Sequence, residues 1–345
     1  MRAPAAIVTV LLAGCGTESL VSPDAPQSST ADAPGPADAP RPADAPPKPA
    51  DAPPKPPDAP PSPPDAPPSP PDAPPSPPAD AGARAGPGVR PNAGNTGVPP
   101  GVTLTVVEGD LVVTDDGASV DARDVHGFLI IRASNVHVTR CLVRGRATSG
   151  NASVIDVQSG TGAVIEDTEV AVAFPSAGVD GFGGSHFTVR RLDIHGGVDG
   201  MKAGSASTIE YTYIHDLMSF DHDPNQGGGP THNDAIQILE GTTIHVTGNT
   251  LLPAKSQNAA IQITEDFGTV TDVHVDANYA DGGGCTFNFS HKGAASLDGL
   301  TTTNNRFGRN SFFNCPILKS TQTHLDSSGD VWDDDGTPVP IQTHD

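Results

Sequence analysis

A short motif recurs along residues 101–345 and constrains the fold more than any other feature of the chain. It has an apolar residue, two variable residues, then Asn, Thr, Cys or Leu, any residue, and a second apolar residue. The copies are Val138–Val143, Ile165–Val170, Val189–Ile194, Ile209–Ile214, Val246–Leu251, Val275–Ala280 and a weaker Thr302–Phe307. Their last residues lie 20 to 37 positions apart, and a period in the twenties is typical of a solenoid.

The repeating unit is made of strands, because its apolar segments are short, β-branched and alternating. A second short strand is expected after each motif: Val154–Val157, Gly181–Gly183, Gly200–Ala203, Ala235–Ile238, Ala260–Ile263, Thr286–Phe289 and Pro316–Leu318. Parallel crossovers are nearly always right-handed, and stacked coils bury the apolar side that one coil cannot bury alone. The sequence therefore predicts an all-β, single-stranded right-handed parallel β-helix of about eight coils over residues 101–345.

Aligned second strands place residues in columns along the predicted helix. The inward column is Ile155, Phe182, Met201, Ile236, Ile261, Phe287 and Ile317. The outward column beside it is Asp156, Gly183, Lys202, Gln237, Gln262, Asn288 and Leu318. Adjacent strands lie about 4.8 Å apart, so Lys202 and the amides of Gln237, Gln262 and Asn288 form a polar stripe. We interpret the three amides as candidate substrate-binding residues for a chain of sugars.

A third column contains three carboxylates on consecutive coils, Asp180, Asp199 and Asp234. Like charges this close repel unless a cation or a shared proton relieves them. Three oxygen donors suit Ca²⁺, whereas Asp before Gly is also a common turn pair in which the carboxylate caps its own turn. Both interpretations stay open, a calcium site and a structural ladder. Lys202, within one coil of these residues, is a candidate catalytic base.

An insertion interrupts the period between Leu217 and His232, where the step lengthens to 37 residues. Long loops on rigid solenoids commonly border a binding groove. His215 and His232 flank the insertion and are candidate catalytic acids or bases near neutral pH. The segment 215–234 contains four Asp and three His, but it lacks a regular zinc-ligand spacing, and both His residues also suit ordinary loop hydrogen bonds.

The repeat pattern resembles the pectate-lyase-like superfamily of right-handed parallel β-helices over about residues 101–330. The segments Asp199-Gly200-Met201-Lys202 and 232–237 resemble secreted bacterial β-helix proteins of unsettled activity. The Asp column with Lys202 is similar to polysaccharide lyase family nine, which implies Ca²⁺ held by Asp180, Asp199 and Asp234 and a lysine base. That family's full calcium motif does not align with this sequence, and the fold hosts many reactions.

The first residues have the features of an export signal. Arg2 precedes an apolar run, residues 5–12, that is too short to span a bilayer. Leu12-Ala13-Gly14-Cys15 resembles the lipobox of bacterial lipoproteins, which implies a signal peptide over residues 1–15 and lipidation at Cys15. An ordinary secretory signal is the alternative. We expect a lipid-anchored protein of the bacterial cell envelope that meets the membrane only through this anchor.

Residues 16–100 are expected to be a disordered tether rich in Pro, Ala and Asp. Of 37 prolines, 25 fall between Pro23 and Pro78, and such a sequence favours extended polyproline II over a packed core. The repeats are also compatible with a proline-motif ligand for a partner domain. Residues 81–100 contain more Gly, Ala and Asn and are expected to form a flexible joint.

Charge and cysteine content restrict the partners and the compartment. Residues 101–345 carry 31 acidic and 13 basic side chains, so we exclude nucleic acid as a partner. We also expect a monomer. Cys285 and Cys315 fall in the same column on successive coils, within reach of a disulfide. Cys141 occupies the Asn/Thr position of its motif and is expected to be a buried thiol.

These features predict a glycan-active protein of the cell surface. The first hypothesis is a polysaccharide lyase that cleaves a uronate polymer by β-elimination, with Ca²⁺ on the carboxylates and Lys202 as base; a glycoside hydrolase with paired carboxylates is a related hypothesis. The second is a noncatalytic β-helix that binds a polysaccharide or a neighbouring cell. Its signature would be a stripe of amides and aromatic side chains with no acid–base pair.

Overall fold

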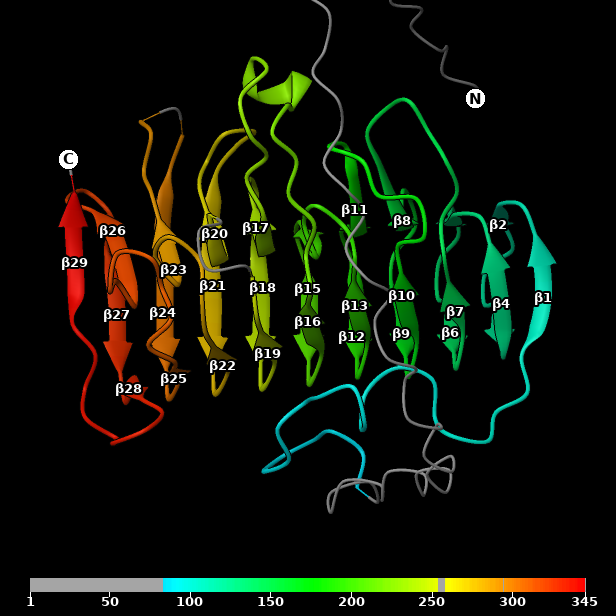
Figure 1. The fold of residues 1–345 in the computed structure, drawn as a ribbon, viewed down its shortest axis with the longest axis horizontal. Helices are drawn as coiled ribbons and strands as arrows, with labels where there is room; N and C mark the ends of the chain where they lie inside the picture. Colours follow the sequence, from blue (N-terminus) through cyan, green and yellow to red (C-terminus); the bar gives the residue numbers. More distant parts are fainter. Residues whose placement is uncertain (1–82, 254–257, 294, 345) are drawn as a thin grey trace, which may run out of the picture. The chain divides into compact units, whose positions relative to one another are not determined.

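Residues 105–344 form a parallel β-helix in the computed structural model, which describes residues 83–253, 258–293 and 295–344. Each complete coil contributes one strand to each of three parallel sheets, which we call sheets I, II and III. The coils stack along one axis from β1 to β29 (Figure 1). The all-β, right-handed parallel β-helix expected from the sequence is confirmed, with ten strands in sheet I and in sheet II where about eight coils were expected.

The strands are short and follow one another around the coil. Sheet I contains β1 (Thr105–Glu108), β4 (Arg123–His126), β7 (Leu142–Val143), β10 (Glu169–Ala171), β13 (Asp193–His195), β16 (Tyr213–His215), β19 (Thr250–Leu251), β22 (Tyr279–Ala280), β25 (Arg306–Phe307) and β28 (Val331–Trp332). Sheet II contains β2 (Leu111–Val113), β5 (Leu129–Ile131), β8 (Ala152–Val157), β11 (Val179–Gly184), β14 (Met201–Ala203), β17 (Asp234–Ile238), β20 (Ala259–Ile263), β23 (Phe287–Phe289), β26 (Ile317–Ser320) and β29 (Ile341–His344). Sheet III contains β3 (Ser119–Asp121), β6 (His137–Thr139), β9 (Ala163–Glu166), β12 (Phe187–Arg190), β15 (Ser207–Glu210), β18 (Gly241–Thr247), β21 (Val270–Asp276), β24 (Leu297–Thr303) and β27 (Leu325–Ser328).

The sequence motif spans two strands, so each coil has three strands where two were expected. Its first residue is the second-to-last residue of a strand of sheet III, and its last lies in the next strand of sheet I. One residue with positive φ makes the bend between them. These residues are Arg140, Asp167, Arg191, Tyr211, Gly248, Ala277 and Asn304. A bend of a single residue leaves no turn signature of its own in the sequence, which explains why the two strands were taken as one.

The Asn/Thr position that follows the bend points into the interior and forms a buried hydrogen-bond ladder. The Oδ1 atom of Asn278 accepts the Asn249 N–H at 2.9 Å, and the Oδ1 atom of Asn305 accepts the Asn278 N–H at 3.0 Å. Asp330 extends the ladder by accepting the Asn305 N–H at 2.9 Å. At the bend the regular backbone pairing between coils is interrupted. Each of these side chains therefore accepts a backbone N–H of the preceding coil that would otherwise have no partner.

Residues 83–104 precede the first strand and bind to the coil. Arg84 Nη2 lies 2.5 Å from Asp167 Oδ1, and the Gly97 N–H donates to the Arg191 carbonyl at 2.8 Å. Near the other end of the helix, Arg90 pairs with Asp333 at 2.7 Å. Residues 83–100 were expected to belong to the linker, and here they pack along the coil. The predicted signal peptide, Cys15 and the Pro-rich repeats lie outside the described residues.

Apart from the ladder at the bend, an apolar core runs through the interior of the coil. The inward column of sheet II is in register as predicted: Ile155 pairs with Phe182, Phe182 with Met201, and so on to Ile317. All seven of these side chains are fully buried. Within the described residues, no helix has the length and apolarity needed to cross a membrane.

Candidate functional site

The inserted segment forms a long loop, residues 216–233, between β16 and β17. It contains the short 3₁₀-helix η1 (Pro224–Gln226). Asp223 is the N-cap of this helix, and its side chain accepts the Asn225 N–H. The loop stands away from the coil beside β17 (Figure 1). Asn233 is fully buried and fastens the loop base by donating Nδ2 to the carbonyls of Val198 and Met218. The 37-residue step therefore marks a projecting, anchored loop, as the sequence predicted.

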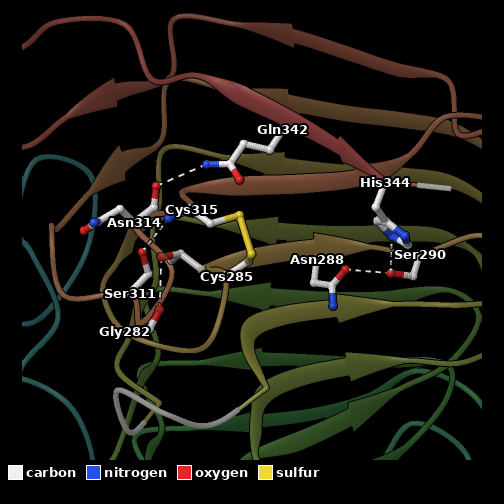
Figure 2. The surroundings of a disulfide bond; sticks show 10 residues. Gly282, Cys285, Asn288, Ser290, Ser311, Asn314, Cys315, Gln342 and His344 are labelled. Atoms are coloured by element: carbon white, nitrogen blue, oxygen red, sulfur yellow. Dashed lines mark hydrogen bonds between the residues drawn. A yellow bond between two sulfur atoms is a disulfide. The ribbon is translucent and has the colours of Figure 1, made fainter.

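A second loop, residues 308–316, connects β25 to β26 and is fastened by a disulfide. Cys285 and Cys315, expected as a pair from their shared column, are joined with their Cα atoms 4.6 Å apart. Figure 2 shows the bond linking the segments that precede the neighbouring strands β23 and β26, with Asn288 nearby. Ser311 Oγ accepts the Cys315 N–H at 2.9 Å. The loop so held carries Phe312 and Phe313, which are exposed and contact each other edge to face.

A groove of about 570 Å³ lies on sheet II between the two loops. The long loop contributes Phe220, Asp221 and His232 to its lining. The loop 308–316 contributes Phe313. Asn288, in β23, and Asn258, just before β20, also line the groove. Aromatic faces, amides, a carboxylate and an imidazole thus line one open cavity.

The outward column of sheet II is in register as the sequence predicted, but only part of it lines the groove. Lys202 pairs with Gln237, Gln237 with Gln262, and Gln262 with Asn288. Of these four side chains, Asn288 alone is among those that line the groove. Gln237 donates Nε2 to Asp234 Oδ2 at 3.1 Å, and Gln262 is buried.

The three carboxylates form a ladder beneath this column. Asp180 Oδ1 accepts the Asp199 N–H at 3.3 Å, and Asp199 Oδ1 accepts the Asp234 N–H at 2.8 Å. Glycine follows the first two carboxylates because a Cβ at Gly181 would lie 2.6 Å from the Gly200 carbonyl oxygen. Asp180 and Asp199 therefore each cap the coil that follows, whereas the structural interpretation expected each carboxylate to cap its own turn.

Lys202 is bound to this ladder. Its Nζ atom lies 2.7 Å from Asp180 Oδ2 and 3.1 Å from Asp199 Oδ2. Burial lowers the pKa of Lys202, but the charges of the two carboxylates outweigh burial, and its pKa is raised. At neutral pH the side chain is therefore an ammonium ion, held by Asp180 and Asp199. A general base must be unprotonated, so this geometry does not favour Lys202 as the base of an elimination.

Burial dominates the titration of all three carboxyls. It raises the pKa of Asp180 to about 7, assisted by the charge of Asp199. It also raises the pKa of Asp199, although Lys202 acts in the opposite direction. Asp234 is fully buried, and burial raises its pKa well above the usual value. Perturbed carboxyls of this kind occur at functional sites and in structural networks alike.

The donor set does not fit the predicted calcium ion. Ca²⁺ takes six to eight oxygen ligands, whereas here the ammonium of Lys202 occupies the position between Asp180 and Asp199. The outer oxygen of Asp234 accepts hydrogen bonds from Gln237 and Asn258. Across the described parts of the chain, no three His, Cys, Asp or Glu side chains converge as metal ligands do.

Adding Ca²⁺ is accordingly expected to leave the melting temperature unchanged, because the Lys202 ammonium already occupies the position between Asp180 and Asp199. Differential scanning fluorimetry with millimolar Ca²⁺, and again with EDTA, tests this. A rise in melting temperature that EDTA reverses would contradict the prediction and restore the calcium hypothesis.

The two histidines are separated by the fold. His232 is exposed and lines the groove. His215 lies in sheet I, where its ring stacks on Tyr213 and bonds Asp193 and Asp216, each at 2.8 Å. Burial lowers the pKa of His215, but these two hydrogen bonds outweigh burial, and its pKa is raised. His215 is outside the groove lining, so of the two candidates only His232 lines the groove.

Sequence reasoning missed the aromatic and amide residues of the groove, namely Phe220, Phe313 and Asn258. Phe220 is in the predicted rim loop, but an aromatic residue in a loop carries no signal by itself. Phe313 precedes Cys315 by two residues, so the predicted disulfide already indicated a held loop next to the stripe. Comparison of the chain with known protein families, with curated proteins and with solved structures finds no match in any of the three.

Proposed function

We propose that the protein binds a polysaccharide in the groove on sheet II and does not cleave it. The observation that carries this proposal is the cavity of about 570 Å³ between Phe220 and Phe313, with the amides of Asn258 and Asn288 beside them. Aromatic rings pack on the apolar faces of sugars, and amides donate to and accept from hydroxyl groups. The cavity is open to solvent, so it can accept an internal segment of a polymer and needs no chain end.

The chemistry around the groove favours binding over cleavage. Lys202 is held as an ammonium ion by two carboxylates, and the Asp180, Asp199 and Asp234 side chains are buried beneath the sheet surface. Neither set presents a free base and a free acid to a ligand in the groove. Lipidation at Cys15, if it occurs, would hold this binding site at the cell envelope, and the anchor remains part of the proposal.

Cleavage of a uronate polymer is the second candidate function, favoured by one observation. His232 lines the groove, as Asp221 does, and an imidazole is a suitable general base near neutral pH. This version of the lyase hypothesis uses His232 in place of Lys202 and needs no step at the carboxylate ladder.

The test is affinity electrophoresis of the full-length protein through gels containing neutral and uronate polysaccharides. At least one glycan is expected to retard it, and Phe313→Ala is expected to weaken that retardation about tenfold, the effect of losing about 1.4 kcal/mol of ring packing. Phe313 is 67% exposed, so its truncation should not unfold the loop. Phe267→Ala, at a ring that is 74% exposed and outside the groove lining, is the matched control.

Three outcomes decide between the functions. Retardation that Phe313→Ala weakens and Phe267→Ala leaves unchanged supports the binding groove. Release of unsaturated uronates, followed by their ultraviolet absorbance and lost in His232→Ala, supports the lyase. Mobility that no polysaccharide changes, with no product released, contradicts both.

A further inference from the structure

Lys202 lies close enough to Asp180 and Asp199 for a reaction between the side chains as well as for an ion pair. The Nζ atom approaches Asp180 Oδ2 to 2.7 Å, which brings it against the Asp180 carboxyl group. Both carboxyl side chains are shielded from solvent, at 9% and 4% exposure, whereas Lys202 is 43% exposed. The ammonium is therefore confined between two buried acids, with solvent on its outer side.

The second oxygen of Asp180 is also engaged. Its Oδ1 atom accepts the Asp199 backbone N–H at 3.3 Å. A backbone donor at this position polarises the carbonyl and stabilises the negative charge that develops on Oδ1 when a nucleophile attacks the carboxyl carbon. Asp199 in turn is positioned by the Asp234 N–H, which donates to its Oδ1 at 2.8 Å, leaving its Oδ2 beside the Lys202 ammonium.

We propose that Lys202 and Asp180 condense into an intramolecular amide bond, with Asp199 transferring the protons. Asp199 Oδ2 takes one proton from the ammonium, and the free amine attacks the Asp180 carboxyl carbon. The N–C bond forms, the C–Oδ2 bond breaks, and Oδ2 leaves as water with two of the three ammonium protons. The third proton stays on the amide nitrogen. Counted from the ammonium and the carboxylate, charge and atoms balance, and no oxidant, reductant or co-reactant is needed.

Proximity makes this condensation feasible where it would fail between free molecules. Well-oriented intramolecular reactants reach effective concentrations of about 10⁵–10⁸ M, which favours the amide over the separate ions. Burial raises the pKa of Asp180 to about 7, so the proton that leaves the ammonium can pass to Asp180 Oδ2 near neutral pH, and the carboxyl group protonated in this way is the electrophile. The exposed side of Lys202 gives the released water a way out.

The bond would staple two neighbouring coils. Asp180 lies in β11 and Lys202 in β14, adjacent strands of sheet II. The amide would also remove two buried or half-buried charges, whose desolvation otherwise opposes folding. A covalent link of this kind suits a surface protein whose coils must resist unfolding, and it assigns a role to a triad that the groove does not use.

Peptide mapping of the full-length protein tests the proposal. Trypsin cleaves after Arg146, Arg190, Arg191, Lys202 and Lys255 in this region, which would yield the linear peptides 147–190, 192–202 and 203–255. The amide would block cleavage after Lys202, and a branched peptide joining 147–190 to 192–255 would appear, one water lighter than its two parts. The protein is incubated for days at neutral pH before denaturation and digestion.

Three variants test the roles that the proposal gives to the three side chains. Lys202→Arg and Asp199→Asn are expected to abolish the branched peptide, the first by removing the nucleophile and the second by removing the proton carrier. Asp180→Asn is expected to retain it, because an asparagine at this position yields the same amide and releases ammonia. Recovery of the linear peptides alone from the unaltered protein overturns the proposal, whatever the variants do. A branched peptide that persists in Asp199→Asn overturns the role given to Asp199.

Discussion

The protein is expected to lose stability as the pH rises from about 5 to 8, and Asp234 is expected to be the main cause. Its carboxyl is fully buried, and burial raises its pKa well above the usual value. The folded state therefore keeps a proton that the unfolded chain releases. The resulting stabilisation is complete below the unfolded pKa of about 4 and is lost as the pH rises through the folded pKa. His215, whose pKa is also raised, changes stability in the same direction.

Carboxylates at the surface limit the stability of the protein at low pH. The Arg146 guanidinium lowers the pKa of Asp110, and the Arg144 guanidinium lowers the pKa of Asp124. Their contribution is present above the unfolded pKa and is lost as the pH falls through the folded one. Maximum stability is therefore expected near pH 4 to 5.

Asp234→Asn isolates the buried carboxyl. Each pKa unit corresponds to about 1.4 kcal/mol. Between pH 5 and pH 8, the difference in unfolding free energy between this variant and the unaltered protein is therefore expected to shift in favour of the variant by more than about 1 kcal/mol. Melting temperatures measured across that range give the comparison. Asp326→Asn, at a side chain that is 75% exposed, is the matched control and should leave the profile unchanged. A parallel profile for Asp234→Asn and the unaltered protein would contradict the assignment.

Replacing Asn278 by Leu is expected to destabilise the fold strongly, because it breaks the buried ladder at the bend. Asn278 is buried, its Nδ2 donates to the Val246 carbonyl at 2.9 Å, and its Oδ1 accepts the Asn249 N–H at 2.9 Å. Leu has the same branched shape but leaves both backbone groups buried and unsatisfied, at about 1–3 kcal/mol each. We expect a loss on the order of 4 kcal/mol and a fall in melting temperature of about 10 °C.

The control for the ladder is Asn310→Ala. Asn310 is exposed and donates only to Asp281 at the surface, so its removal should change the unfolding free energy by about 0.5 kcal/mol or less. Thermal unfolding followed by circular dichroism measures both variants. A loss for Asn278→Leu as small as that for Asn310→Ala would show that the interior tolerates unsatisfied backbone groups at the bend.

Much of the fold was predictable because a β-helix repeats one local geometry. The inward residues of successive coils must stack, so aligning Ile155 with Phe182 and Met201 was enough to predict the register of sheet II. The same alignment brought Cys285 next to Cys315 and the three aspartates into one ladder. The bend within the motif was not predictable, because one residue in the left-handed conformation, such as Tyr211, leaves no signature that distinguishes two strands from one.

The sequence by itself determined which residues align in columns on successive coils. Only the tertiary structure decided which of these residues are exposed and which are paired with a charged neighbour. Register depends on neighbouring coils alone, and their spacing is the same everywhere along the helix. Exposure and charge depend on loops that differ from coil to coil. Lys202 is outward in the column as predicted, yet its distances to Asp180 and Asp199 make it an ion-pair partner instead of a free base. The groove likewise exists because two loops, 216–233 and 308–316, stand on coils that are distant in the sequence and border the same stretch of sheet II.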